Sequence, residues 1–496
     1  MKKPPILLSL VTILAGCGGR TPAPITAKLM EEIECQDAAA QVLQKDFWDA
    51  ALDSTVLAAA DTAMTFRVPT RGITDQRSSG RCWYYSTTNI LRAELFAQEE
   101  ADDWGDFQFS QAFGQFYDLL EKSNRFLENV VEYRREPIDS RMNNWLFRKP
   151  FGDGGHFSNA AHLIDKYGLV PQEAMPETHS SGYNLTLMNG IRTLMRKYGL
   201  QLRECPAAEI PQVKARALRD VYNLLALSIG TPPEEFEWQG VTYTPLSFRD
   251  RFVHHDMERD YINLMNDPTL PYGKVYEVRD SRNCVEYAPW RFLNVPMGVI
   301  NAAGVASLRA GRMFYISADT GKEGLPDEGV YDTRLFRPDS LSGIDFSMSK
   351  ADMLRSGEMT SLHAIAVAGV RLAGCNAQKG GCGAQQGECS GRQGDCDEQA
   401  RGCHARQGDC SERQSGCGAQ QGECNARPCE CTPRMWLIEN SFGTARGWDG
   451  FVVMSADWWD CYLLRAVFER RFLPENILAA YDAGPIHELP SWNICY

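Results

Sequence analysis

The sequence predicts an α+β protein made of two segregated subdomains, with helices early in the chain and strands later. Apolar residues recur three and four positions apart in the segments 110–135 and 158–168, which is typical of amphipathic helices. Short apolar runs typical of strands occur at 311–321, 362–372, 434–443 and 450–459. A set of helices followed by a set of strands favours separate helical and sheet parts.

Local signals support the helices in turn. The segment 110–135 keeps its apolar stripe over its whole length. In the segment 158–168, Ser158 can cap the start of a helix and Gly168 can end it. The composition of the whole chain of 496 residues is that of an ordinary globular protein, with 44% hydrophobic and 23% charged residues. The formal net charge of −13 argues against a nucleic-acid partner, because phosphate binding depends on clustered Lys and Arg.

The N-terminus is typical of an export signal. Two lysines precede an apolar stretch too short to span a membrane, and Leu14-Ala15-Gly16-Cys17 follows. This order resembles the bacterial lipobox, in which the cysteine is acylated. We therefore expect residues 1–16 to be a signal peptide and Cys17 to anchor the protein to a membrane through lipid. An ordinary signal peptide with a chance cysteine is the alternative.

The expected location is the bacterial cell envelope, with the protein lipid-anchored on the periplasmic or extracellular face. Residues 17–45 follow the signal as a tether and short helical lead-in. The seventeen cysteines of the chain agree with an oxidising compartment, where disulfides persist.

The segment 375–431 is a cysteine-rich repeat with a period of seven residues. Its many glycines and its lack of Leu, Ile and Val argue against a coiled coil. Cysteines seven apart on a helix are about 10.5 Å from each other, too far for a disulfide. A disulfide-laced or partly disordered insertion is the favoured interpretation, and sequestration of soft metal ions is the alternative. The globular part would then comprise 46–374 and 432–496.

Cys82 stands between a glycine-bearing loop and an aromatic-rich run that contains no Gly or Pro. If a helix begins there, its N-terminus favours a thiolate and lowers the pKa of the thiol. This makes Cys82 a candidate nucleophile. A buried cysteine that acts only as a small hydrophobic residue is the alternative.

A cysteine nucleophile needs a base and an oxyanion donor. His363 is the histidine placed at the mouth of a buried strand, in "SLHAIAVAGV". Asn440 ends another hydrophobic strand, and its amide oxygen can accept the imidazole N–H and orient the ring. Gln76 and the backbone N–H of Cys82 can stabilise a developing oxyanion.

These motifs occur in the order Gln–Cys–His–Asn and resemble a papain-like cysteine peptidase of the bleomycin hydrolase and aminopeptidase C branch. Further matching stretches run from about residue 66 to 492, among them "DQRSSGRCW", "KYGLVPQEAMPETHSS", "LHAIAVAGV", "WLIENSFGTARGWDGFVVMS" and "GPIHELPSW". The resemblance implies a papain-like fold of two subdomains with helical insertions.

The resemblance also implies the roles of individual residues. Cys82 matches the nucleophile, His363 the general base and acid, Asn440 the orienting amide and Gln76 the oxyanion donor. Gly154 and Gly155 match glycines that line the cleft and let an extended peptide substrate approach the backbone. No cofactor or catalytic metal is implied, and a homohexamer is the assembly known in the family.

Three departures accompany the resemblance. Phe442 replaces the tryptophan usual after Asn-Ser, and its ring can still shield the histidine–asparagine bond. The repeat lies between His363 and Asn440, so it must loop outward. In the family the C-terminal carboxylate binds the substrate's amino terminus. Here Tyr496 takes that place at the end of a shorter tail, so we expect the carboxylate to lie farther from Cys82.

We therefore predict a thiol peptidase, with aminopeptidase activity implied by the resemblance. The rival hypothesis is a non-catalytic surface lipoprotein that displays the cysteine-rich loop to a metal or a partner on a peptidase-like scaffold. The intact set of Gln76, Cys82, His363 and Asn440 argues against that rival.

Overall fold

The computed structural model describes residues 44–360, 362–373 and 432–492. The chain divides into two units, residues 1–50 and 51–496. In the first unit the described residues include helix α2 (Phe47–Ala50), and everything below concerns the second unit. Cys17, Tyr496 and the repeat 375–431 lie outside the described residues, so the predictions about them stay predictions. Within the described ranges, no helix has the length and apolar character needed to cross a bilayer.

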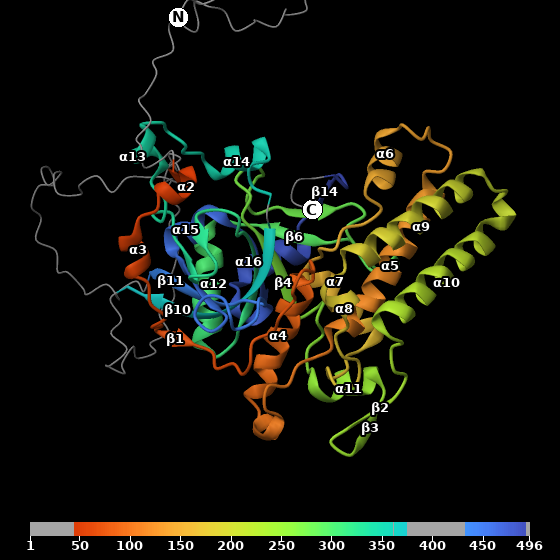
Figure 1. Ribbon diagram of the computed structural model, residues 1–496, viewed down its shortest axis with the longest axis horizontal. Coiled ribbons are helices and arrows are strands. Elements are labelled where there is room, and N and C mark those ends of the chain that lie inside the picture. The colour runs from red at the N-terminus through yellow and green to blue at the C-terminus, as the bar shows by residue number, and fades with distance from the viewer. Residues whose placement is uncertain (1–43, 361, 374–431, 493–496) are drawn as a thin grey trace, which may run out of the picture. The chain divides into compact units, whose positions relative to one another are not determined.

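Helices dominate the first half of this unit and a sheet dominates the second half (Figure 1). The helical elements of the first half are α3 (Ser54–Ala58), α4 (Cys82–Phe96), η2 (Glu99–Trp104), α5 (Gln111–Glu132), α6 (Arg141–Arg148), α7 (Phe157–Tyr167), α8 (His179–Gly182), α9 (Leu185–Glu204), η3 (Ala207–Glu209), α10 (Ile210–Ile229) and α11 (Pro245–Phe252). Those of the second half are α12 (Met297–Arg309), α13 (Pro338–Ser342), α14 (Lys350–Ser356), α15 (Ala456–Tyr462), η4 (Arg470–Phe472) and α16 (Glu475–Ala483).

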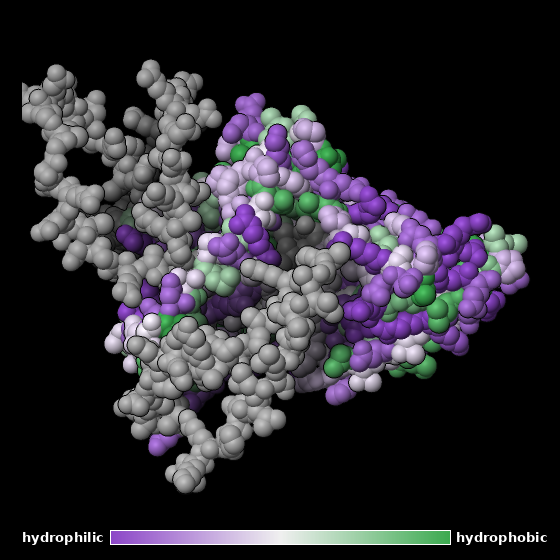
Figure 2. Space-filling model, turned by 90° about the horizontal axis from the view of Figure 1, so that it is seen from above, coloured by the Kyte–Doolittle hydropathy of each residue, from purple (hydrophilic) through white to green (hydrophobic). Residues whose placement is uncertain are grey.

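Helices α5, α9 and α10 pack together beside the sheet and have their own hydrophobic core (Figure 1). Phe116, Leu127, Ile191 and Leu225 are fully buried in it. Polar residues cover the outer face, and Figure 2 shows mostly hydrophilic surface at this end of the molecule with isolated hydrophobic residues. The predicted helix in 110–135 is α5, whose first turn is capped by the side-chain oxygen of Ser110.

The predicted helix in 158–168 is α7, but the expected cap is wrong. The helix begins at Phe157 with His156 as its N-cap, so Ser158 lies inside the first turn. The backbone N–H of His156 donates to Oδ1 of Asn159 at 2.9 Å, which stabilises this earlier start. Gly168 ends the helix as expected at a φ of +82°, and a Cβ atom there would lie 2.2 Å from the carbonyl oxygen of Pro245.

The second half is built on one large sheet, predominantly antiparallel, in which β10 lies between β7 and β11. The strands of the unit are β1 (Phe66–Arg67), β2 (Phe236–Trp238), β3 (Val241–Tyr243), β4 (Tyr261–Met265), β5 (Val275–Val278), β6 (Arg291–Asn294), β7 (Phe314–Asp319), β8 (Gly324–Leu325), β9 (Val330–Tyr331), β10 (Leu362–Leu372), β11 (Pro433–Glu439), β12 (Phe451–Ser455), β13 (Leu463–Glu469) and β14 (Ile486–Leu489). Among the described residues, β2 and β3 are the strands that form a separate pair. The four predicted strand segments correspond to β7, β10, β11 and β12.

Strands β10 and β11 form the hairpin that carries the repeat at its closed end. Leu372 pairs with Pro433, and the backbone N–H of Ala373 donates to the carbonyl of Thr432 at 2.9 Å. His363 lies near the opposite end of β10, roughly 30 Å from Leu372 at the usual rise of a strand. The insertion therefore begins and ends far from the part of the hairpin that holds His363 and precedes Asn440.

Helix α4 lies where the helical part meets the sheet, and it packs against β10 and β7 (Figure 1). Trp83 and Ile90 of this helix share one hydrophobic core with Tyr315 and Ile365 of the sheet. The helix begins at Cys82, as predicted. This packing brings the first turn of α4 to the strand that carries His363.

Candidate active site

The sulfur of Cys82 lies at the N-terminal end of α4 and next to strand β10. The backbone of Ala364, the residue after His363, forms a hydrogen bond with the Cys82 side chain. The cysteine keeps partial exposure, whereas the neighbouring Trp83 is buried. The contact between α4 and β10 thus places the candidate nucleophile beside the candidate base.

The electrostatic setting of Cys82 differs from the expectation. Burial raises the pKa of the Cys82 thiol to about 11, with a smaller rise from the charge of Asp153. Hydrogen bonds from the backbone of Ala364, Trp83 and Cys82 itself lower the pKa, as predicted for a helix N-terminus, but burial outweighs them. The thiol is consequently not ionised by its own surroundings, and it needs a base to become a nucleophile.

His363 and Asn440 form the predicted pair. Nε2 of His363 lies 3.0 Å from Oδ1 of Asn440. The same amide oxygen accepts the backbone N–H of Ser441 at 2.9 Å, which identifies it as the oxygen rather than the nitrogen of the amide. Nε2 must therefore carry the proton, and Nδ1 has its lone pair free to accept one.

Phe442 covers this pair, as expected for an aromatic residue at that position. Its ring stacks on the imidazole of His363, with centroids 4.8 Å apart and an interplanar angle of 15°. Burial lowers the pKa of His363 below its usual value of 6.5, although the hydrogen bond to Asn440 acts in the opposite direction. The imidazole is accordingly neutral at neutral pH, which is the form that a general base requires.

Gln76 is held in the same place by the segment that follows Asn440. Its backbone N–H donates to the carbonyl of Ser441 at 2.9 Å, and its side-chain Oε1 accepts the hydroxyl of Ser441 at 2.6 Å. Its Nε2 donates to the carbonyl of Ser79 at 2.6 Å. An amide nitrogen has two N–H groups, so one remains for an oxyanion.

The two glycines that were expected to line the cleft have different surroundings. A Cβ atom on Gly155 would lie 2.7 Å from the indole of Trp83, so the packing of α4 requires a glycine there. Gly154 is exposed and faces open space. The preceding Asp153 accepts a hydrogen bond from the backbone N–H of Gly80, which ties this loop to the start of α4.

A buried ion pair joins the helix of Cys82 to the strand that precedes Asn440. Nη2 of Arg92 in α4 lies 2.9 Å from Oε1 of Glu439 in β11, and both side chains are almost fully buried. Sequence reasoning missed this pair, as it missed Ser441 and Asp153. A charged residue in a sequence is normally expected on the surface. The available signal was position in the sequence: Glu439 and Ser441 flank Asn440, and Asp153 directly precedes Gly154.

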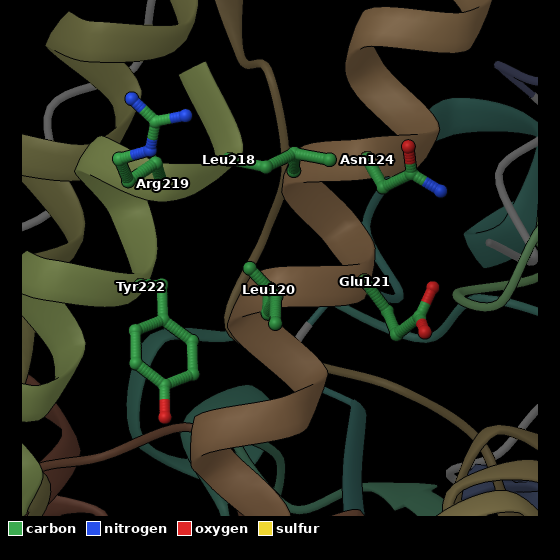
Figure 3. Close-up of a pocket in the computed structure, with 6 residues that line it drawn as sticks. All are labelled: Leu120, Glu121, Asn124, Leu218, Arg219 and Tyr222. Carbon is green, nitrogen blue, oxygen red and sulfur yellow. The ribbon is translucent and has the colours of Figure 1, made fainter. Parts of the chain in front are cut away.

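Three cavities formed by the described residues lie elsewhere. The one in Figure 3, of about 380 Å³, lies between α5 and α10 and is lined by Leu120, Glu121, Asn124, Leu218, Arg219 and Tyr222. Two others, of about 270 and 620 Å³, share His162 and residues 257–259. Cys82, His363, Asn440 and Gln76 line none of the three.

Glu94, His255 and Glu469 form the one group in the described ranges whose ligand atoms converge as a metal site would require. The guanidinium of Arg312 already lies among them. It pairs with Glu94, and its Nε lies 2.6 Å from Oε1 of Glu469. The group is therefore an ion-pair network in which the cation is arginine, and we assign it no metal.

Comparisons with known proteins agree with this geometry. The model of the Peptidase C1-like family matches residues 23–395 and 427–495. The chain is 32% identical over 450 residues to Aminopeptidase C of Lactobacillus delbrueckii subsp. lactis, covering 87% of each protein. It is 28% identical over 438 residues to Aminopeptidase E of Lactobacillus helveticus, covering 86% of each. Among solved structures, PepW from Lactobacillus rhamnosis HN001 matches with a TM-score of 0.75 and 27% identity, over 91% of this chain and 92% of that one.

Proposed function

Because the chain belongs to the Peptidase C1-like family and has its papain-like cysteine-peptidase fold, we propose that it is an aminopeptidase with Cys82 as the nucleophile. The observation that carries the proposal is the 3.0 Å contact between Nε2 of His363 and Oδ1 of Asn440. His363 lies on β10, and the backbone of the next residue of that strand, Ala364, forms a hydrogen bond with the Cys82 side chain. This contact supports the role of His363 as the base, because it leaves the lone pair of Nδ1 free to accept the proton of the Cys82 thiol.

In the proposed reaction His363 takes the proton of Cys82, and the sulfur attacks the peptide carbonyl carbon. The oxyanion receives hydrogen bonds from Gln76 Nε2 and from the backbone N–H of Cys82. The tetrahedral intermediate then collapses, the C–N bond breaks, and His363 gives its proton to the leaving amine. Water, deprotonated by His363, releases the acyl group from the sulfur and restores the thiol.

The C-terminal segment is anchored, through Asp280, to the helix that contacts the Gly154 loop. Strand β14 pairs with β5, and the hydroxyl of Ser491 donates to Oδ2 of Asp280 at 2.7 Å. The carbonyl of Asp280 accepts a hydrogen bond from Arg125 on α5. One turn earlier on that helix, Lys122 donates to the carbonyl of Gly154 at 2.9 Å. The last described residues are thus fastened to the helix that also holds the Gly154 loop.

A comparison of free and blocked peptides tests the proposed aminopeptidase specificity. If a carboxylate at the end of the chain recognises the substrate's amino terminus, a dipeptide amide with a free amine should be cleaved about a hundredfold faster than its acetylated form. This factor corresponds to losing one charge-assisted contact of about 3 kcal/mol. Equal rates for both, with product from internal bonds of longer acetylated peptides, would instead identify an endopeptidase.

The names of the relatives favour an active aminopeptidase over the rival hypothesis of a non-catalytic surface lipoprotein.

We further propose that Cys17 carries lipid and holds the enzyme in the bacterial cell envelope, and that the enzyme assembles as a homohexamer. Replacing Cys17 with serine should move the enzyme from the membrane to the soluble fraction, because the thiol that accepts the acyl chain is lost. Retention of the variant in the membrane fraction would contradict the anchor.

A further inference from the structure

The loop before Cys82 contains a residue with an unfavourable backbone conformation, which contacts from the rest of the protein must stabilise. Arg77 adopts a φ of +52°, a left-handed conformation that residues other than glycine rarely take. It directly follows Gln76, the proposed oxyanion donor. An oxyanion donor works only if its N–H reaches the position where the negative charge develops. The contacts that hold this loop therefore bear directly on catalysis.

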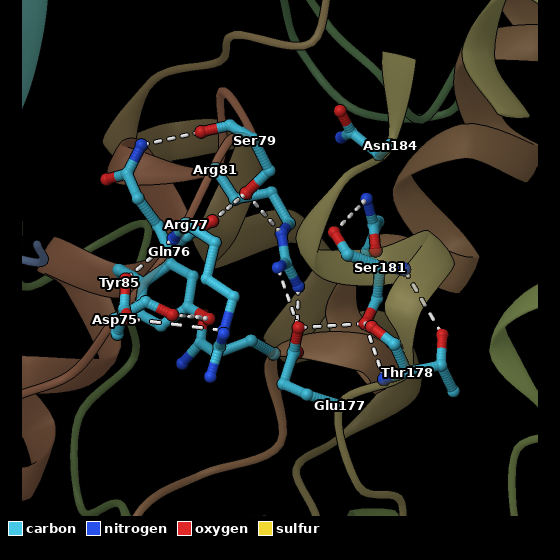
Figure 4. Close-up of polar contacts among 12 residues, drawn as sticks. Asp75, Gln76, Arg77, Ser79, Arg81, Tyr85, Glu177, Thr178, Ser181 and Asn184 are labelled. Carbon is cyan, nitrogen blue, oxygen red and sulfur yellow. Dashed lines mark hydrogen bonds and ion pairs between the residues drawn. The ribbon is translucent and has the colours of Figure 1, made fainter. Parts of the chain in front are cut away.

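A continuous chain of hydrogen bonds runs from Gln76 to the helical part of the protein (Figure 4). The hydroxyl of Ser79 donates to the carbonyl of Gln76 at 2.6 Å and accepts from Nε of Arg81 at 2.9 Å. The other two nitrogens of Arg81 bind both oxygens of Glu177, at 2.8 and 2.7 Å. The Arg81 side chain is only 3% exposed, whereas that of Glu177 is 25% exposed, so the guanidinium is buried and the carboxylate lies at the edge of solvent.

Glu177 is itself fixed at the start of α8. Its Oε2 accepts the hydroxyl of Ser181 at 2.8 Å, and the side chain of Thr178 caps the same helix. Figure 4 shows Glu177 between Arg81 and the segment that contains Thr178 and Ser181. One end of the chain of contacts thus lies on the helical part, and the other end determines where the carbonyls of Gln76 and Ser79 point.

We propose that the Arg81–Glu177 pair is a positioning device that orients the amide of Gln76 through Ser79. This inference rests on the proposed function. The Ser79 carbonyl takes one N–H of Gln76 Nε2, and the direction of that bond determines where the second N–H points. Arg81, Ser79 and Glu177 touch neither the substrate nor the sulfur in this scheme, so their effect is on transition-state stabilisation and not on the reactivity of the thiol.

Three variants test the proposal: Ser79→Ala, Arg81→Met and Glu177→Gln. Each should lower kcat by about 10- to 100-fold with little change in KM, since a small misplacement of a catalytic group costs up to this much. Alkylation of Cys82 by iodoacetamide should keep its wild-type rate, because displacement of iodide forms no oxyanion. Arg81→Lys should remain impaired, because a lysine cannot bond Ser79 and both carboxylate oxygens at once.

A double-variant comparison separates positioning from simple structural support. In a Gln76→Ala background, Arg81→Met should cause no further loss of kcat, because the group that it positions is absent. Arg334→Met is the matched control. Arg334 also binds both oxygens of one carboxylate, that of Asp332, at 2.9 and 2.7 Å, although its side chain is 55% exposed, and its loss should leave kcat unchanged.

Independent, multiplying effects of Arg81→Met and Gln76→Ala would overturn the proposal, as would wild-type kcat in Ser79→Ala and Glu177→Gln. If Arg81→Met does not fold, the other two variants decide the matter, with thermal unfolding as the check on their structure. A wild-type protein that hydrolyses no peptide would remove the proposed function and this inference together. Wild-type activity with unimpaired variants would remove this inference alone.

Discussion

Replacing Cys82 with alanine should abolish peptide hydrolysis, with a fall in kcat on the order of 10⁴-fold or more. The sulfur is the atom that would form the acyl-enzyme, and no neighbouring side chain offers a substitute nucleophile in the proposed reaction. The measurement is the steady-state rate on a free-amine dipeptide amide, with thermal unfolding to show that the variant is folded. The unfolding measurement is needed because the Cys82 side chain is partly buried against the core.

Cys205→Ala is the matched control for this experiment. Cys205 is also a free, half-exposed cysteine in the described part of the chain, but it follows α9, away from the site residues. Its removal should leave the rate unchanged. An active-site epoxide or iodoacetamide should label Cys82 faster than the other free thiols at pH 6, because His363 can take its proton although burial raises the pKa of the thiol. Equal labelling of all of them, or wild-type hydrolysis by Cys82→Ala, would contradict the assignment of the nucleophile.

Replacing His363 with alanine should lower kcat by about 10² to 10⁴, the usual contribution of a general base and acid. The wild-type enzyme should lose activity as the pH falls through the pKa of His363, which burial has lowered below 6.5, because protonated imidazole cannot accept the thiol proton. On the alkaline side, the pH profile should fall only as the pH approaches the Cys82 pKa of about 11. The measurement is kcat/KM against pH.

In His363→Ala the acid limb should disappear together with the rate, and selective labelling of Cys82 at pH 6 should be lost. His487→Ala is the matched control, since His487 lies exposed on β14 and away from the β10–β11 hairpin. It should keep the full pH profile. A His363→Ala variant that retained the wild-type acid limb would show that another group titrates there.

Several features of the site were predictable because they depend on neighbours in the sequence. An unbroken aromatic run after Gly80 indicated that a helix begins at Cys82, and it does. Apolar runs beside His363 and Asn440 indicated strand ends, and β10 and β11 run there. The start of α7 was misjudged because the polar residues His156, Ser158 and Asn159 lie within four positions, and the choice of cap depends on contacts that periodicity does not encode.

The sequence by itself thus determined the residue types of the site, their order and the elements that carry them. Only the tertiary structure decided that Ser441 bridges Gln76 and Asn440, that Arg92 and Glu439 join α4 to β11, and that Arg81 reaches Glu177. It also reversed the expected pKa shift of Cys82. The physical reason is that helix and strand formation depend on residues a few positions apart, whereas burial and charge pairing depend on atoms that folding brings together from distant parts of the chain.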